Sequence, residues 1–277
     1  MDKSSKYSAE WVSAYFDAYG EQEWDRFSHS AVDQVSLYVH THYIERYVKP
    51  ASRVLEVGAG PGRFTQVLAR LDCRVVVADI SQVQLDLHRK HAAESGFDAA
   101  VEDRVCLDVC DMNTLPSESF DAVVCYGGPL SYVFDMAGKA LSECVRVCRK
   151  GGRILASVMS LWGACHRYLD GVLQVPPEDN RKITDTGDLT PENWKAATHL
   201  CHMFRSNELR EMAGRAGMGV VVMSASNCLS TRWDERLSTL KDDPASWDEL
   251  LRMELEACRQ EGCLDMGTHI ILVGEKT

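Results

Sequence analysis

The chain has 277 residues, 45% of them hydrophobic and 26% charged, a composition typical of a globular protein that buries a sizeable core. Lysine and arginine number 30 against 41 acidic residues, which gives a formal net charge of −11. This acidic balance argues against binding to a nucleic-acid backbone. No stretch approaches the ~18 apolar residues of a membrane span, and the start of the chain lacks the apolar core of a secretory signal. We therefore expect a cytoplasmic protein that binds neither nucleic acid nor a membrane; its oligomeric state stays open.

The 11 cysteines could suggest disulfides. Most of them lie in apolar patterns, however, and none forms a Cys-x-x-Cys pair. An odd number of such residues favours reduced, buried thiols that act as small hydrophobic side chains.

Residues 1–50 are rich in aromatic and charged side chains. Trp11, Tyr15 and Tyr19 recur at helical spacing, and a second set with the same spacing follows around Tyr38, which predicts two helices. Pro50 then breaks the pattern. We interpret residues 1–50 as an N-terminal helical cap ahead of the main domain.

From residue 51 onward, short apolar strands alternate with amphipathic helices. The expected strands are Arg53–Val57, Arg74–Ala78, Val105–Val109, Phe120–Cys125, Arg153–Val158, Val220–Met223 and His269–Gly274, and the expected helices are Gly62–Leu71, Ser81–Ser95, Ala137–Arg149, Asn207–Ala216 and Trp247–Arg259. Such alternation predicts an α/β fold: a doubly wound, mostly parallel, Rossmann-like sheet with helices on both faces. We expect the last two strands to pair antiparallel at one edge. Residues 51–277 are thus predicted to form one domain.

The regular alternation lapses over residues 160–205. This stretch contains Trp162, the pair Pro176-Pro177 and Trp194. An irregular segment of that length in a compact domain is usually a lid or a binding insertion. We expect it to cover the binding site for a substrate.

The sharpest signal is the sequence VLEVGAGPGRF, with glycines at 58, 60 and 62 between the first strand and the first helix. Glycine lets the backbone approach a ligand closely, and the N-terminus of the following helix favours a negative group. The spacing is G-x-G-x-G, whereas dinucleotide oxidoreductases carry G-x-G-x-x-G. In the dinucleotide motif the third glycine would stand at position 63, which is Arg63 here. An acid, Glu56, also precedes the first glycine by two residues. Both features point away from NAD as the ligand.

Acidic residues also follow successive strands. Asp79 ends the second strand, where a carboxylate can accept hydrogen bonds from ribose hydroxyls. Asp111 follows the third strand, and the fourth leads into Tyr126-Gly127. Because the carboxyl ends of parallel strands share one edge of the sheet, these residues are expected to converge on one ligand.

Five motifs follow one another over residues 53 to about 158, in this order: VLEVGAGPGRF, VVVADIS, DVCDMNTLP, FDAVVCYGG and LSECVRVCRKGGRILAS. In these motifs the chain resembles the class I S-adenosylmethionine-dependent methyltransferases. The resemblance implies S-adenosylmethionine as the cofactor. It implies that Asp79 holds the ribose, that Ile80 packs on adenine, and that Asp111 accepts from the adenine amino group beside Met112. The cofactor-binding residues expected on this basis are Tyr15, Tyr19, Arg26, Glu56, Gly58, Ala59, Gly60, Gly62, Asp79, Ile80, Asp111, Met112, Tyr126 and Gly127.

Aromatic ring faces can attract the positively charged sulfonium of the cofactor. The candidates for this contact are Tyr15, Tyr19, Trp24 and Tyr126. Arg26 is a candidate partner of the methionine carboxylate. Ordinary packing between helices is an equally good interpretation of Tyr15, Tyr19, Trp24 and Arg26.

Transfer of an activated methyl group mainly requires alignment of the acceptor and exclusion of water, so we expect no metal. His166, His199 and His202 lie in or beside the predicted lid and are candidate general bases, with Tyr126 as a further catalytic candidate. The sequence His199-Leu-Cys-His202 lacks the second ligand pair that a structural zinc site needs.

The residues after the fourth strand partly limit the nature of the methyl acceptor. The sequence there is Tyr126-Gly-Gly-Pro-Leu, and the Asn/Asp-Pro-Pro-aromatic motif of family members that methylate base or glutamine amines is missing. This favours a small-molecule acceptor, whose reacting atom stays open. The alternatives are an NAD-dependent oxidoreductase and a non-catalytic module that binds S-adenosylmethionine; a protein substrate also stays possible.

Overall fold

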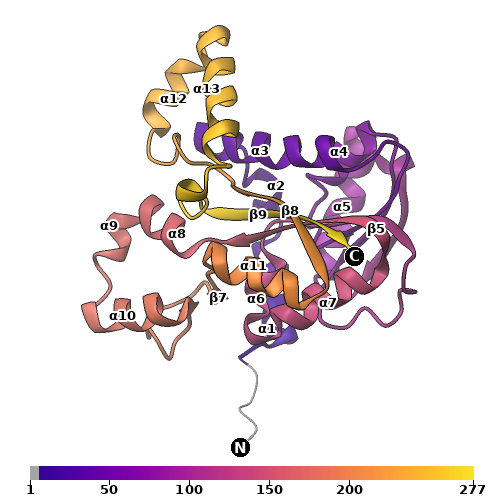
Figure 1. Cartoon of the computed structure of the whole chain (residues 1–277), viewed down its shortest axis with the longest axis horizontal. Helices are drawn as coiled ribbons and strands as arrows, with labels where there is room; N and C mark the ends of the chain where they lie inside the picture. The colour runs from indigo at the N-terminus through magenta and orange to yellow at the C-terminus, as the bar shows by residue number, and fades with distance from the viewer. Residues whose placement is uncertain (1–5) are drawn as a thin grey trace, which may run out of the picture.

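The computed structural model describes residues 6–277, so residues 1–5 of the predicted cap lie outside it. Its centre is a seven-stranded sheet of order β3-β2-β1-β4-β5-β9-β8 (Figure 1). The strands are β1 Arg53–Val57, β2 Arg74–Asp79, β3 Val101–Cys106, β4 Phe120–Cys125, β5 Cys148–Met159, β8 Met218–Ala225 and β9 His269–Lys276.

The first five strands are parallel, which confirms the predicted doubly wound sheet. The two C-terminal strands pair antiparallel at one edge, as expected. There β9 inserts between β5 and β8 and runs antiparallel to both. The carboxyl ends of β1, β2, β4 and β8 therefore lie on the same edge of the sheet as the start of β9.

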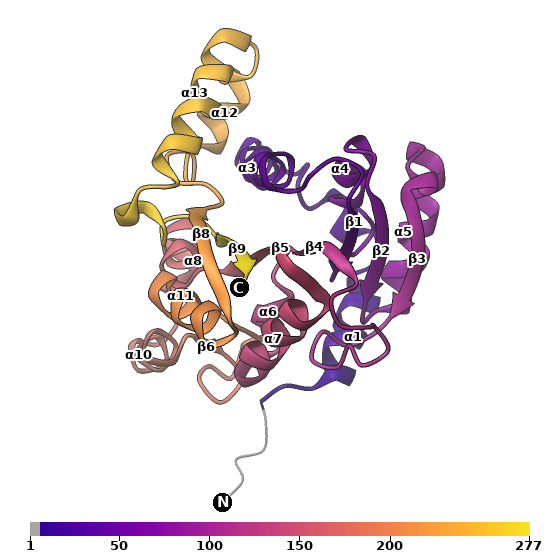
Figure 2. The ribbon, with the colours of Figure 1, turned by 45° about the vertical axis from the view of Figure 1, so that its right-hand side comes forward.

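Helices cover both faces of the sheet, as Figure 2 shows. The helices are α1 Ala9–Tyr19, α2 Gln22–Asp25, α3 Ala31–Tyr47, α4 Thr65–Arg70, α5 Gln82–Ser95, α6 Pro129–Tyr132, α7 Ala137–Val147, α8 Leu161–Arg167, α9 Leu169–Val172, α10 Pro177–Thr186, α11 Ser206–Arg215, α12 Asp234–Leu240 and α13 Pro244–Ala257. No helix within residues 6–277 is long and apolar enough to cross a membrane.

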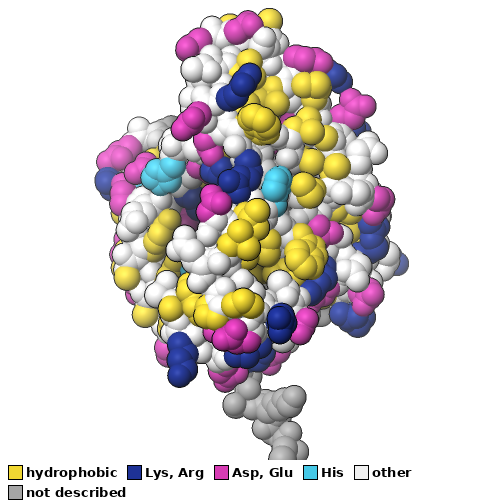
Figure 3. Space-filling model, turned by 90° about the vertical axis from the view of Figure 1, so that its left-hand side faces the viewer, with side chains coloured by type: hydrophobic (Ala, Val, Ile, Leu, Met, Phe, Trp, Pro, Cys, Tyr) yellow, Lys and Arg dark blue, Asp and Glu magenta, His cyan; other side chains and the backbone are white. Residues whose placement is uncertain are grey.

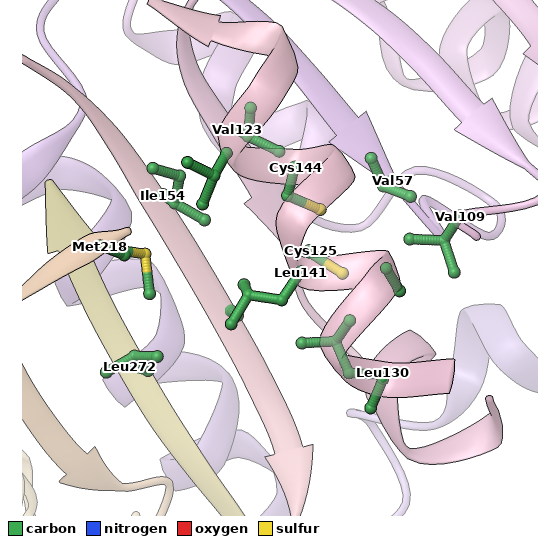
Figure 4. Close-up of a cluster of buried hydrophobic side chains, with 14 of the residues drawn as sticks. Val57, Val109, Val123, Cys125, Leu130, Leu141, Cys144, Ile154, Met218 and Leu272 are labelled. Carbon is green, nitrogen blue, oxygen red and sulfur yellow. The ribbon is translucent and has the colours of Figure 1, made fainter. Parts of the chain in front are cut away.

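Alternate residues of each strand feed two separate hydrophobic cores, as the period of two in a strand requires. Leu55 and Val57 of β1 pack with α6, α7 and α11, and Figure 4 shows the centre of this core around Leu141 and Ile154. Val54 of β1 packs on the opposite face with α3, α4 and α5. This double burial explains why the strands are near-continuous apolar runs.

The third strand was predicted at Val105–Val109 and is found at Val101–Cys106, so the predicted position was wrong by about four residues. The cause is that β3 lies at the edge of the sheet. Its residues Glu102 and Asp103 are exposed, and the apolar run used for the prediction belongs to the turn after the strand. All eleven cysteines are free, and only Cys106 is exposed.

The N-terminal part contains three helices where two were predicted, because α2 forms a short turn between α1 and α3. Helix α1 packs against α5, and the hydroxyl of Ser13 donates to the carbonyl of Ile80, directly after β2, at 3.2 Å. This helix therefore lies over the edge of the sheet where β2 ends.

The segment predicted to be irregular contains α8, α9, α10 and a short hairpin of β6 Asp188–Leu189 and β7 Cys201–His202. Its apolar residues Leu161, Ile183 and Met203 form one cluster with Val12 of α1. Farther along the chain, α12 and α13 stand out from the body of the molecule (Figure 1) and pack on α3 through Leu237.

Candidate functional site

The glycine loop between β1 and α4 has a backbone that only glycine adopts without strain. Gly58 and Gly60 have φ angles of +64° and +53°, in the left-handed region. A Cβ at Gly58 would lie 2.3 Å from the ring of Pro129. At Gly60 it would point toward the side chain of Glu23, 3.3 Å away. The loop is thus packed closely beneath α6 and opens toward α2.

Asp79 connects this loop to the next one. Its Oδ2 accepts from the Gly60 amide and its Oδ1 from the Ser81 amide, both at 2.9 Å. Burial raises the pKa of Asp79 to about 6, while hydrogen bonds from backbone amides, those of Ser81 and Gly60 above all, lower it. At neutral pH the side chain is therefore an ionised carboxylate.

A cavity lies above these residues. Gly58, Ala59, Gly60, Asp79 and Ile80 form one side of it, and the opposite side comes from α1, α2 and the start of α6. Its position beyond the carboxyl ends of parallel strands is where open α/β sheets bind ligands.

Two charged side chains of the N-terminal helices close this cavity. Glu23 and Arg26 form an ion pair at 3.1 Å, and an Arg26 amino group lies 3.5 Å from the carbonyl oxygen of Gly127. Burial raises the pKa of Glu23, and the Arg26 charge opposes this. Asp79 and Glu23 thus make the cavity a favourable environment for a cationic group.

A second cavity adjoins the first. Both are lined by Phe16, Glu23, Arg26, Phe27 and Tyr132. The second cavity also takes in residues of α1, α8, β7 and the turn before β9. Aromatic and apolar side chains form most of its wall, as in pockets for small molecules.

A tyrosine–histidine pair lies where the two cavities meet. The Tyr132 hydroxyl is 3.0 Å from His199 Nε2, and the two rings stack with an interplanar angle of 6°. Burial lowers the pKa of His199 and raises that of Tyr132. Both side chains are consequently neutral at neutral pH, and the hydroxyl can donate to the imidazole.

His202 is in a different electrostatic state. Its Nδ1 lies 2.6 Å from Asp188 and its Nε2 lies 2.9 Å from Glu208. Desolvation opposes protonation, but the two carboxylates outweigh it and raise the pKa of His202 to about 9. A histidine that is already protonated cannot act as a general base at neutral pH, so the geometry does not favour the base role predicted for His202.

The structure distributes the predicted site residues over three environments. Lining the first cavity are Arg26, Gly58, Ala59, Gly60, Asp79, Ile80, Tyr126 and Gly127. The second cavity includes Arg26 again, together with Tyr15, Tyr19 and His199. Outside both cavities lie Glu56, Gly62, Asp111, Met112, His166 and His202.

Several of the outlying residues have clear structural surroundings. Asp111 is exposed, whereas Met112 is buried in the hydrophobic core. Trp24 stacks on His91 with ring centroids 3.9 Å apart. His166 lies 3.5 Å from the carbonyl oxygen of Met266.

Glu56 anchors the loop from below. It accepts a 2.5 Å hydrogen bond from the Thr65 hydroxyl, which also lies 2.9 Å from His88 Nε2. Arg104 donates to the other ring nitrogen of His88, so His88 carries its proton on Nε2 and donates to Thr65. Burial raises the pKa of Glu56 to about 8. Glu56 therefore positions the loop without facing the cavity.

The cavity residues that were not predicted include three with polar side chains: Glu23, Asp108 and Tyr132. Asp108 lies three residues before the predicted Asp111 and accepts from the Cys110 amide at 2.7 Å. Tyr132 follows the fourth strand shortly after the motif that suggested Tyr126. The run of acids after β3 could have suggested Asp108, but no local pattern distinguishes Glu23 from the other acids of α2.

Residues 54–152 match a family model described as a methyltransferase domain. A ubiquinone biosynthesis O-methyltransferase of Hahella chejuensis is 31% identical over 116 residues, which is 42% of this chain and 47% of that protein. The chain thus matches about half the length of this curated relative.

Among solved structures, the cyclase SpnF superposes with a TM-score of 0.63 at 18% identity, over 98% of this chain and 96% of that one. A methyltransferase of Thermotoga maritima, titled a possible histamine N-methyltransferase, gives a TM-score of 0.56 at 16% identity, over 95% and 99% of the two chains.

Residues 54–152 are therefore a methyltransferase domain. In this domain match and in its sheet order, the chain is similar to the class I S-adenosylmethionine-dependent methyltransferases.

The ion triad of His202 generates a testable pH dependence. Because its pKa is raised above the ordinary 6.5, to about 9, its stabilisation is complete below pH 6.5 and is lost as the pH rises through about 9. We expect the wild type to lose about 2–3 kcal/mol more unfolding free energy than His202→Gln between pH 6 and pH 9.5. Urea denaturation at both pH values measures this difference, with His166→Gln as the matched control. Equal losses in the wild type and His202→Gln would show that the triad does not form.

Proposed function

We propose that this protein transfers a methyl group from S-adenosylmethionine to a small-molecule acceptor by in-line displacement. The observation that carries the proposal is the pair of adjoining cavities. One of them is lined by the glycine loop and Asp79, and the other is aromatic and contains His199. The methyltransferase domain match supports the donor side, and the eleven free cysteines support a reducing, cytoplasmic location.

The residues of the first cavity fit the cofactor. Asp79 keeps lone pairs free for ribose hydroxyls beyond its two backbone hydrogen bonds. Glu23 and Arg26 offer opposite charges to the amino and carboxylate ends of a methionine group. Two buried oxygens, the Tyr126 hydroxyl and Gln84 Oε1, have no hydrogen-bond partner within residues 6–277. The cavity thus has polar groups that a polar ligand can satisfy.

We assign the adenine end of this cavity to Ile80, Leu107 and Asp108, which line it together. The sequence pointed to Asp111 and Met112 for this part. Because Asp111 is exposed and lines neither cavity, Asp108 is the acid placed to accept from an adenine amino group.

The cofactor, when bound, supplies a methyl group already activated for displacement. The protein has to exclude water and to remove a proton from the acceptor. We propose that residues 160–205 act as a lid, together with the N-terminal helical cap of residues 1–50 over the 51–277 domain. The apolar cluster that joins Val12 of α1 to Leu161, Ile183 and Met203 supports this closure.

We propose that Tyr132 and His199 carry the proton. An acceptor hydroxyl at the junction donates to the Tyr132 oxygen while the Tyr132 hydroxyl donates to His199 Nε2, 3.0 Å away. As the acceptor oxygen takes the methyl group, each proton moves one step along this line, and His199 ends as an imidazolium. The neutral state of both side chains before reaction suits this role.

Oxygen is the favoured acceptor atom because the relative from Hahella chejuensis is named an O-methyltransferase and because a base faces the junction. The NAD alternative is not favoured, since the glycine loop lacks the dinucleotide spacing. A module that only binds S-adenosylmethionine stays as the alternative that turnover would exclude.

The first test is a calorimetric titration with S-adenosylhomocysteine, with NAD as the control. We expect saturable binding of the former alone. Asp79→Ala should weaken it more than tenfold, because two hydrogen bonds to a carboxylate worth ~1.5 kcal/mol or more each are lost. Gly60→Val should abolish it, because the side chain would project toward Glu23 across the cavity.

The matched control is Asp86→Ala, an exposed acid on α5, which should bind as the wild type does. Wild-type affinity in Asp79→Ala would contradict the ribose assignment. Binding of NAD alone would overturn the proposed function.

A second test concerns the base. His199→Phe should lower kcat for any acceptor that is turned over by about 10²-fold or more, while S-adenosylhomocysteine binds with unchanged affinity. Labelled methyl transfer measures kcat, and His166→Gln, outside both cavities, serves as the control. If His199→Phe kept the wild-type kcat and pH profile, the proton relay would be wrong.

A further inference from the structure

The far wall of the second cavity is built where β8 ends and β9 begins. The strand register pairs Ala225 with Ile270, so the next two residues of each strand also lie opposite one another. The Thr268 amide donates to Asn227 Oδ1 at 3.1 Å, and Ser226 Oγ also donates to it at 3.1 Å. These two bonds hold the Asn227 side chain in one orientation, with its Oδ1 occupied.

The other end of Asn227 is unpaired. Its Nδ2 is buried and has no hydrogen-bond partner anywhere in the described chain, residues 6–277, and the same is true of His269 Nε2. Asn227 is only 1% exposed. Both residues line the second cavity. A buried polar group without a partner is costly, and here two such groups border one space that is large enough for a ligand.

We infer that Asn227 and His269 form a second anchor for the methyl acceptor and bind a hydroxyl or carbonyl oxygen other than the one that is methylated. This inference rests on the proposed function, because it assumes that the second cavity holds the acceptor. It defines the substrate class as a small molecule with two oxygen functions on an apolar body.

The chemistry of the two side chains selects oxygen. The Nδ2 group of Asn227 only donates, so its partner must have lone pairs. Burial keeps the pKa of His269 well below its ordinary value, and the ring is therefore neutral. Its Nδ1 lies 3.4 Å from the Thr268 hydroxyl. A hydroxyl group satisfies Asn227 and either tautomer of His269, and a carbonyl satisfies the tautomer protonated on Nε2.

The anchor is separate from the point of methyl transfer. Tyr132 lines both cavities, whereas Asn227 and His269 line only the second. The wall of the second cavity also includes the apolar side chains of Met159 and Met203. One oxygen of the acceptor thus faces Tyr132, the other faces the anchor, and the body between them packs on apolar groups.

The experiment uses two matched pairs of phenols. In each pair the second compound adds one oxygen: 4-ethylphenol with 4-hydroxyacetophenone, and 2-naphthol with 2,6-dihydroxynaphthalene. Dissociation constants are measured for the full chain saturated with S-adenosylhomocysteine. We expect the compound with the added oxygen to bind about tenfold more tightly in at least one pair, because a site built to hydrogen-bond a group rejects the analogue that lacks it.

Variants of the anchor separate this preference from general packing. Asn227→Asp keeps an oxygen for the Thr268 amide but loses both N–H donors, and His269→Phe loses the ring nitrogens; each should bring the ratio within a pair close to one. His269→Gln should restore part of it. Val221→Thr, at an exposed position of β8, is the control and should keep the full ratio.

The possible failures are distinguishable. If S-adenosylhomocysteine itself does not bind, the proposed function is wrong. If it binds but none of the four phenols does, or both ratios in the wild type stay below about threefold, the anchor is overturned while the donor site stands. A full ratio in both Asn227→Asp and His269→Phe also overturns the anchor.

Discussion

The site depends on one buried carboxylate at the end of β2. Asp79 accepts one hydrogen bond from the glycine loop, at Gly60, and one from the start of the next crossover, at Ser81. Both loops leave the sheet at the same edge, so a single side chain sets their separation. The floor of the first cavity follows from that separation, and helices α1 and α2 only have to cover it. A nearby acid without these two contacts could not define the cavity.

This arrangement has a cost in stability. The pKa of Asp79 is raised to about 6 and that of Glu56 to about 8, so burial disfavours the charged form of each. This loss of folding stability begins as the pH rises above the ordinary pKa of a carboxyl group. It is complete once the pH exceeds the raised pKa of the buried group. Glu23 adds a third acid with a raised pKa. Groups held at such a cost are typical of functional sites, and a cationic ligand in the first cavity would offset the repulsion between Asp79 and Glu23.

The features that were predicted best are those that depend on residues close together in the sequence. The glycine loop, Asp79 and the inner strands are encoded in short apolar runs with turn residues after them, and the structure has them where they were expected. The edge strand β3 was misplaced because exposed residues such as Glu102 mask its pattern. The histidines show the limit more sharply. His199 and His202 are three residues apart, yet burial beside Tyr132 makes one a neutral cavity residue, and Asp188 with Glu208 makes the other a fixed cation. Contacts between distant segments decide such roles, and local patterns do not contain them.

The two cavities are encoded by different parts of the chain. The first arises from consecutive strand ends between β1 and β4, the part that matches the family model. The second is assembled from α1, α8, β7 and the turn before β9, which lie mostly outside that match. A cyclase shares the fold over nearly its whole length, so the sheet alone does not determine the reaction. On the face that Figure 3 shows, hydrophobic side chains lie among charged ones, and Trp162 and Leu173 of the 160–205 segment are exposed. If the second cavity holds the acceptor, as proposed, the choice of acceptor can change through the helices and turns around it while Asp79 and the glycine loop stay as they are. On the proposed function, Arg26, Tyr132 and the other residues that border both cavities would serve donor and acceptor together.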